Sequence, residues 1–149
     1  MIALILLSLG GAIIAAVVGT FWYSDSTPMG KIHMKSLGFD KLSKEEKKKK
    51  MEEAKPMMPK IYGAQMGLSF LTSFAVVFIV TMSIQSGIPL FVALIFVAIN
   101  WLCFIVPTIG GALLWSNCDP KIVWKKFFSD IFSSLVTLML VALMTSLFV

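Results

Sequence analysis

The sequence has no arginine and a single histidine, so two common kinds of binding and catalysis have few residues to use. Without guanidinium groups, the net charge of +5 comes from lysine and offers no bidentate contact to phosphates or base edges. We therefore expect no nucleic-acid binding. His33 lies in a lysine-rich segment and is expected to be exposed or interfacial rather than a catalytic base.

Cysteine is also scarce. Cys103 and Cys118 are the only two, which is too few for a disulfide framework. Cys103 lies within an apolar run, where we expect a buried thiol. Cys118 lies in a polar connection, where we expect a reduced loop thiol.

Charge is sparse as well. Only 14% of residues are charged and 58% are hydrophobic, whereas a soluble domain has about 25% charged residues. The chain has no cluster of metal ligands, no nucleophile–base set and no glycine-rich phosphate loop. We therefore expect no catalytic residue, no metal and no cofactor. A proton-coupled pump is also disfavoured, because no titratable residue lies at the centre of an apolar run.

What the chain does have is four long apolar runs, at about residues 2–23, 61–84, 90–115 and 127–149. A helix rises about 1.5 Å per residue and bilayer hydrocarbon is roughly 30 Å thick, so each run could span it. The first run lacks the basic start of a signal peptide and is too long for one. The sequence predicts one all-α domain, a four-helix transmembrane bundle. Aromatic residues at the run ends are the expected interface anchors: Trp22, Tyr23, Trp115 and Trp124.

The lysines indicate an orientation. All thirteen fall in the connections 24–60 and 116–126 or at their borders, and the connection between the second and third runs has none. The positive-inside rule then predicts that both connections are cytoplasmic and both termini lie outside. Among the acids, Asp130 comes closest to an exception, about one turn into the fourth run.

The first connection should contain a short charged helix at about 44–55. Ser43 and Glu46 fit a capping box at its start, and Pro56 would stop it. The Lys47–Lys50 run on this helix is expected to be a solvated face, with contact to anionic lipid headgroups as the alternative.

The third run carries Asn100 beside Trp101 near its middle. A buried asparagine must find a partner, so we expect Asn100 to bond another helix, with ligand binding as the alternative. Pro107 followed by Gly110 and Gly111 predicts a kink or an unwound turn. Such a break can be a packing device or can line a binding site.

Small residues recur at helical spacing. They form three stripes: Gly11, Ala15 and Gly19; Gly63 and Gly67; and Ser129, Ser133 and Thr137. In lipid such stripes allow close helix contact. We expect packing within one bundle, while contact between copies of the chain is the alternative.

A loose repeat relates residues 19–36 to residues 111–129. Each stretch runs from a glycine through a tryptophan and serine to a proline followed by lysine. Two helical hairpins related as a parallel repeat would explain the similarity, and so would the ordinary composition of helix ends.

Several stretches resemble a known family. They are KPMMPKIYGAQMGLSFL, NWLCF, the Gly111–Trp115 exit with Pro120, and the closing FFSDIFSSLVTLMLVALM. The chain resembles small four-span membrane proteins catalogued as a domain of unknown function and found mostly in bacteria. The resemblance implies four spans, a bacterial plasma membrane and no established reaction. The chain departs from the family at Ser116, where an acid is common, and at His33.

These observations favour a non-enzymatic integral membrane protein that self-associates or serves as an accessory subunit. Its contact surface would be the small-residue stripes together with Trp22, Trp101, Trp115 and Trp124. The alternative is a passive channel or carrier for a small neutral or lipophilic solute, lined by Asn100, the fourth-run hydroxyls and the Pro107–Gly111 break. A third hypothesis, a lipid-interface enzyme, requires Asp119 or His33 to share a pocket. The expected partners are the bilayer and either further copies or another membrane protein.

Overall fold

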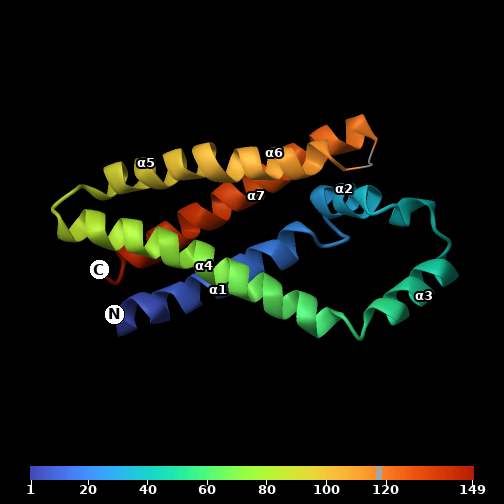
Figure 1. The fold of residues 1–149 in the computed structure, drawn as a ribbon, viewed down its shortest axis with the longest axis horizontal. Helices are drawn as coiled ribbons and strands as arrows, with labels where there is room; N and C mark the ends of the chain where they lie inside the picture. Colours follow the sequence, from blue (N-terminus) through green and yellow to red (C-terminus); the bar gives the residue numbers. More distant parts are fainter. Residues whose placement is uncertain (117–118) are drawn as a thin grey trace.

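The protein is a helical bundle, seen here in a computed structural model that describes residues 1–116 and 119–149. Its elements are α1 (Ile2–Trp22), α2 (Pro28–Ser36), η1 (Phe39–Lys41), α3 (Lys44–Ala54), α4 (Met58–Gln85), α5 (Leu90–Asn100), η2 (Trp101–Ile105), α6 (Val106–Leu114) and α7 (Pro120–Ser146) (Figure 1). The described residues contain no strand. Taking α5, η2 and α6 as one, four helices are long and apolar enough to cross a membrane. The predicted all-α four-helix bundle is confirmed.

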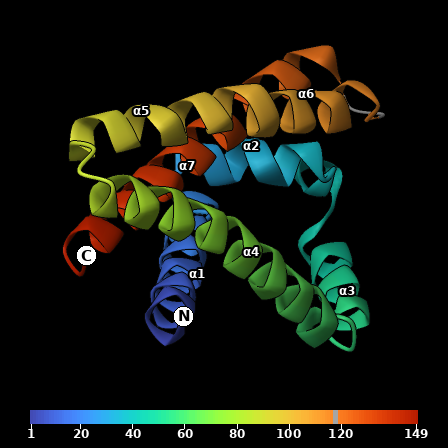
Figure 2. The ribbon, with the colours of Figure 1, turned by 60° about the vertical axis from the view of Figure 1, so that its left-hand side comes forward.

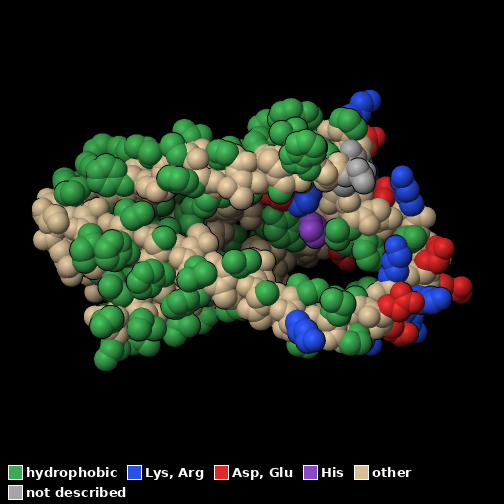
Figure 3. Space-filling view, viewed as in Figure 1, with side chains coloured by type: hydrophobic (Ala, Val, Ile, Leu, Met, Phe, Trp, Pro, Cys, Tyr) green, Lys and Arg blue, Asp and Glu red, His purple; other side chains and the backbone are tan. Residues whose placement is uncertain are grey.

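The two ends of the bundle differ in chemistry. Both lysine-bearing connections lie at the end that holds α2, α3 and the start of α7, here called the basic end (Figure 1). The termini and the α4–α5 turn lie at the other end. In Figure 3 the Lys, Asp and Glu side chains gather at the basic end, while the rest of the visible face is largely apolar.

The core lies toward the end that holds the termini. It consists of seven buried residues from three helices: Val76, Val77, Val80, Val97, Leu138, Val141 and Ala142. The first helix packs closely against this core at Gly11, where a Cβ would lie 2.7 Å from the Ser73 Cβ. The stripe residue Gly11 therefore serves packing within one copy of the chain.

Toward the basic end the bundle opens. Helix α4 packs on α1, α5 and α7, whereas α6 packs mainly on α7. Both ribbon views show α4 and α6 diverging in this direction (Figures 1 and 2). Residues 59–68 of α4 are all exposed, and nothing lies within 4 Å of a Cβ placed on Gly63 or Gly67.

The first connection is more ordered than the sequence predicts, because it also contains α2. Pro28 occupies the first turn of α2, and the Gly30 N–H donates to Thr27 Oγ1 at 2.9 Å as an N-cap. A Cβ on Gly30 would overlap the carbonyl of Ser24, so this tight turn needs glycine. The turn directs α2 back against α7.

The predicted charged helix is confirmed as α3. The Glu46 N–H donates to Ser43 Oγ at 3.2 Å, and the Ser43 N–H donates to Glu46 Oε2 at 2.8 Å. This reciprocal pair is the predicted capping box. Lys48, Lys49 and Lys50 are exposed and Lys47 is half-buried, as expected for a solvated helix.

Two predictions about the second connection and the cysteines need correction. Helix α7 begins at Pro120 rather than 127, because Asp119 caps it by accepting from the Lys121 N–H at 2.8 Å. Most of 116–126 is therefore helical rather than loop. Cys103 is an exposed free thiol rather than a buried one, because its side of η2 faces away from the bundle. The prediction for Cys118 falls outside the described residues.

The predicted break in the third long helix takes the form of a π-helical turn. It spans Trp101–Ile105, just before Pro107. Proline has no N–H to give to the preceding turn, and a π turn is one way for a helix to accommodate this. The chain stays helical through Gly110 and Gly111, and Gly110 faces Phe127 of α7, whose Cε2 would lie 3.3 Å from a glycine Cβ.

Candidate functional site

Four polar side chains from three segments meet where α1 ends. The Tyr23 hydroxyl donates to Asp130 Oδ1 at 2.8 Å, and the Lys126 ammonium donates to Asp130 Oδ2 at 2.6 Å. Lys126 Nζ also lies 3.5 Å from His33 Nδ1, and the His33 ring stands 4.9 Å from the Tyr23 ring. We call Tyr23, His33, Lys126 and Asp130 the polar cluster.

Helix packing holds this cluster in place. The residue before Tyr23, Trp22, donates its indole N–H to Ser129 Oγ at 3.1 Å, one residue before Asp130. The Trp22 ring also stacks on Phe132, with 6.3 Å between centroids. Consecutive residues at the end of α1 thus bond consecutive residues of α7, which fixes the two helices relative to each other.

The charges in the cluster compensate each other. The Lys126 and Asp130 side chains are 17% and 16% exposed and form the single ion pair found in the described part of the chain. In an isolated helix, lysine four residues before aspartate is the less favourable order for an ion pair. We therefore attribute this pair to the contacts that Tyr23 and His33 make with it. Two bonds on its carboxylate keep this partly buried aspartate satisfied.

The surroundings of His33 favour its neutral form by lowering its pKa. Burial lowers its pKa from the ordinary 6.5, and the nearby Lys126 charge lowers it further, while Asp130 opposes both effects. A hydrogen bond from the Lys126 ammonium to His33 Nδ1, 3.5 Å away, requires the tautomer that carries its proton on Nε2.

The polar cluster borders a cavity of about 900 Å³ among α1, α4, α6 and α7. Figure 3 shows a hollow between the two halves of the visible face, with the histidine, in purple, beside a lysine in it. Hydroxyl groups line the cavity deeper in the bundle, from Ser69, Thr72, Ser73, Ser133, Ser134 and Thr137.

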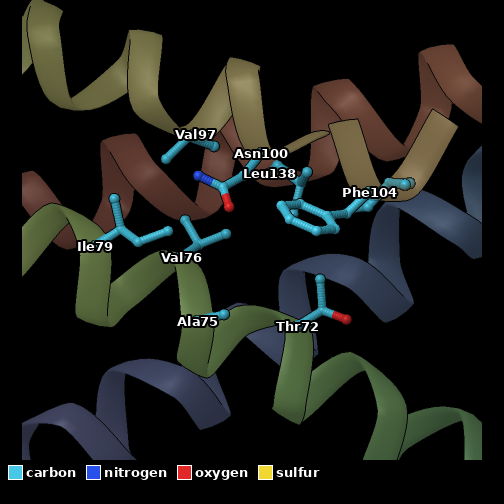
Figure 4. A pocket seen from close by; sticks show the side chains of 9 residues that line it. Thr72, Ala75, Val76, Ile79, Val97, Asn100, Phe104 and Leu138 are labelled. Carbon is cyan, nitrogen blue, oxygen red and sulfur yellow. The ribbon is translucent and has the colours of Figure 1, made fainter. Parts of the chain in front are cut away.

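A smaller apolar pocket of about 290 Å³ adjoins this cavity between α4 and α5–η2 (Figure 4). Thr72, Ile105 and Leu138 line both spaces, so the two lie side by side. The pocket's other lining residues are Ala75, Val76, Ile79, Val97, Asn100 and Phe104. Beyond it lies the apolar core, whose side chains are at most 5% exposed. The larger space has the polar cluster on its wall, and both spaces have core side chains on the side toward the termini.

The asparagine of the third run does not bond another helix. Asn100 is exposed, and its Nδ2 donates to the Phe96 carbonyl of its own helix at 2.9 Å. That prediction was wrong, because an i−4 carbonyl is always within reach of a helical asparagine. Its neighbour Trp101 makes the cross-helix bonds instead, from Nε1 to the Ile131 carbonyl at 3.1 Å and to Ser134 Oγ at 2.9 Å.

The other candidate residues separate into two groups. Ser129 and Ser133 are buried, and Ala15, Gly19, Ser133 and Thr137 line the cavity. Trp115 and Trp124 are exposed, at 90% and 57%, as interface anchors would be. Trp22, which the sequence predicts as an interface anchor, also joins α1 to α7 through its bond to Ser129.

Sequence reasoning did not bring the polar cluster together. Tyr23 was expected as an interface anchor, His33 as an exposed or interfacial side chain, and Asp130 as an exception to the charge pattern. One signal was available: Lys126 and Asp130 stand one helical turn apart beside an apolar run, where a carboxylate needs a partner. Nothing local in the sequence pointed to His33, since α2 brings it there from 93 positions away.

The arrangement brings an ammonium, a carboxylate, an imidazole and a phenol together at the cavity wall. The described residues contain no group of three His, Cys, Asp or Glu side chains that could hold a metal ion. The His33 ring hydrogen-bonds only to Lys126 in the described part of the chain, so it activates no serine or cysteine there. Asp119, the other residue named for the enzyme hypothesis, caps α7 and does not line the cavity.

Comparison with known proteins gives one match. No curated protein and no solved structure matches the chain. A family model described as "Protein of unknown function (DUF1761)" matches residues 6–146, which include nearly all of the four long helices and the whole polar cluster. The resemblance to a family of unknown function is thereby confirmed, and the chain belongs to the DUF1761 family.

Proposed function

We propose that this chain is an integral membrane protein that binds a small molecule in the hollow beside the polar cluster, without transforming it. The four long apolar helices support insertion in a bilayer. The lysines at one end favour placing that end in the cytoplasm. The protein would then act as a binding protein or carrier whose site opens toward the cytoplasmic side.

The observation that carries this proposal is the 900 Å³ cavity with a charged and hydrogen-bonded cluster on its wall. Ligand sites are typically mostly apolar hollows with a few convergent polar groups. Lys126 uses two of its three ammonium hydrogens on Asp130 and His33, and neutral His33 keeps an Nε2 hydrogen. The site therefore offers two donors to the polar part of a ligand.

A passive channel is less well supported than a binding site. The hydroxyl groups of α7 do line the cavity, but Val77, Val80 and Val141 have no exposed surface and close the path beyond them. A solute that entered at the basic end would have to leave by the same route unless the core rearranged.

The test is to purify the protein from native membranes in mild detergent and identify small molecules that remain bound, by mass spectrometry. Lys126→Met should lower the amount of bound ligand about tenfold, because it removes a charge-assisted donor. Lys125→Met is the matched control, since Lys125 is exposed and does not line the cavity. Equal amounts of ligand in both variants, or none in the wild type, would contradict the proposal.

Self-association is a second candidate function, favoured by a different observation. Gly63 and Gly67 lie on the face of α4 away from the cavity, and both have open space around them. Such a small-residue face allows close contact with a helix of a second copy. Gly67→Leu should then reduce the oligomer size in detergent, whereas Gln65→Leu on the cavity side should not. A monomeric wild-type protein in native lipid discs would exclude this function.

A further inference from the structure

We propose that the ligand is a membrane glycerophospholipid, with its phosphate at the polar cluster and one acyl chain in the adjoining apolar pocket. This inference rests on the proposed binding function and names the class of ligand. We call the apolar pocket between α4 and α5–η2, lined by Thr72, Ala75, Val76, Ile79, Val97, Asn100, Phe104, Ile105 and Leu138, the tail pocket.

The two spaces adjoin and differ in polarity, which supports an occupant with two chemical parts. Thr72, Ile105 and Leu138 form the boundary that both spaces share. Along α7, Leu138 lies eight residues beyond Asp130, which is about 12 Å at the helical rise. A molecule bound at the polar cluster would therefore need an extended apolar part to reach the tail pocket.

The polar atoms of the tail pocket are turned to their own helices, which leaves an apolar lining. The Thr72 hydroxyl donates to the Leu68 carbonyl at 3.0 Å, and Asn100 Nδ2 donates to the Phe96 carbonyl. Figure 4 shows the aliphatic side chains Val76, Ile79 and Val97 around Asn100. A hydrocarbon chain suits this lining, whereas a polar solute would find few free donors there.

The divergence of α4 and α6 provides a lateral entrance. Thr72, Ala75, Asn100 and Phe104 are exposed although they line the tail pocket, so the pocket opens sideways from the bundle. In a bilayer that side faces hydrocarbon. A lipid could place its chain there without taking it out of an apolar medium.

A phosphate at the polar cluster would meet the Lys126 ammonium and the His33 ring, beside the Asp130 carboxylate that already pairs with Lys126. Lys126 and neutral His33 each keep a donor, and both line the cavity. The head should contribute the part of the affinity that both lipids of the test share, and the tail pocket should contribute the part that depends on chain length. These two contributions can be separated by experiment.

The test measures binding of two phosphatidylglycerols to the delipidated, detergent-solubilised full chain by native mass spectrometry. One carries two oleoyl chains and the other two hexanoyl chains. Ala75→Phe should fill the tail pocket and weaken binding of the dioleoyl lipid about tenfold, with little effect on the dihexanoyl lipid. Ala64→Phe is the matched control, because Ala64 is exposed on the same helix and lines neither space.

The outcomes distinguish this inference from the proposed function. Lys126→Met should weaken binding of both lipids, since both share the phosphate. If Lys126→Met lowers binding but Ala75→Phe does not, the chain placement is wrong and the binding function stands. If neither variant differs from its control, the lipids bind as a nonspecific annulus and both proposals fail. Inorganic phosphate that competes as well as the dihexanoyl lipid would identify a free-anion site and overturn the lipid assignment.

Discussion

The Trp22 indole donates a hydrogen bond to Ser129, with 3.1 Å between Nε1 and Oγ. The next residue of each segment forms a second bond, from the Tyr23 hydroxyl to Asp130. Each joins the end of α1 to α7 across 107 positions of sequence. The two bonds connect an apolar bundle to the polar cluster, so a change in either should affect both stability and binding.

Removing the carboxylate of the cluster should destabilise the protein. Asp130→Asn leaves the Lys126 charge without its partner in a setting only about one-sixth exposed. We expect the free energy of unfolding to fall by roughly 2 kcal/mol, between the values for exposed and buried pairs. Equilibrium unfolding in detergent measures the change. Asp25→Asn, at an exposed position outside the cluster, should leave stability unchanged.

The indole bond can be tested with a matched pair of tryptophans. Trp22→Phe keeps an aromatic ring against Phe132 but leaves buried Ser129 without its donor. We expect a loss of about 1 kcal/mol in the free energy of unfolding. Trp115→Phe should cost nothing measurable, since Trp115 is 90% exposed. Equal losses in the two variants would mean that the Trp22–Ser129 bond contributes nothing.

The glycines of α1 and α4 should respond differently to the same substitution. Gly11→Ala would place a methyl group 2.7 Å from the Ser73 Cβ, so α1 must shift, at a cost of roughly 1–3 kcal/mol. Gly67→Ala meets open space and should increase stability slightly through its better helix propensity. Thermal unfolding of both variants by circular dichroism measures the difference. A stable Gly11→Ala variant would show that α1 is not closely packed.

Acid should weaken the docking of α2. The pKa of His33 is lowered in the folded state, chiefly by burial and then by Lys126, against Asp130 in the opposite direction. A base with a lowered pKa contributes stability that is complete above its ordinary value of 6.5 and is lost as the pH falls through the folded-state pKa. The free energy of unfolding should therefore decrease below about pH 6.5. In His33→Gln the free energy of unfolding should not change as the pH falls below about 6.5. If the wild-type protein also shows no change there, the prediction is wrong.

The turn before α2 gives a test that is independent of charge. A side chain on Gly30 would overlap the Ser24 carbonyl, so Gly30→Ala should displace α2 and carry His33 away from Lys126. We expect faster amide exchange in residues 28–36 with little change in α4. Gly38→Ala is an unsuitable control because Gly38 has a φ of 73°, whereas Gly19→Ala meets open space and serves well.

The long helices could be predicted because their signal is local. An apolar run of sufficient length specifies its own helix, and the capping pair Ser43–Glu46 lies within four consecutive residues. The sequence predicts a start of α7 that is too late, because the lysines before residue 127 indicate a loop. Asp119 before Pro120 was a helix start signal that weighed more than polarity.

The site could not be predicted in the same way. Its four residues come from the end of α1, from α2 and from α7, and no spacing in the sequence relates them. Asn100 stands out in the sequence as a polar residue within an apolar run. In the structure its amide donates to the Phe96 carbonyl of its own helix rather than to another helix. The polar cluster depends on how α2 folds back at Gly30, and that is a property of the tertiary structure.

In the proposed membrane placement, the valine-rich core would make the two faces of the bilayer unequal for this protein. Val77, Val80 and Val141 have no exposed surface, so in the proposed membrane placement they would separate Asp130 from the side of the termini. A fall in pH or a membrane-impermeant reagent on the lysine side would then act directly on the polar cluster. The same treatment on the opposite side would leave it unaffected for as long as those valines stay in contact.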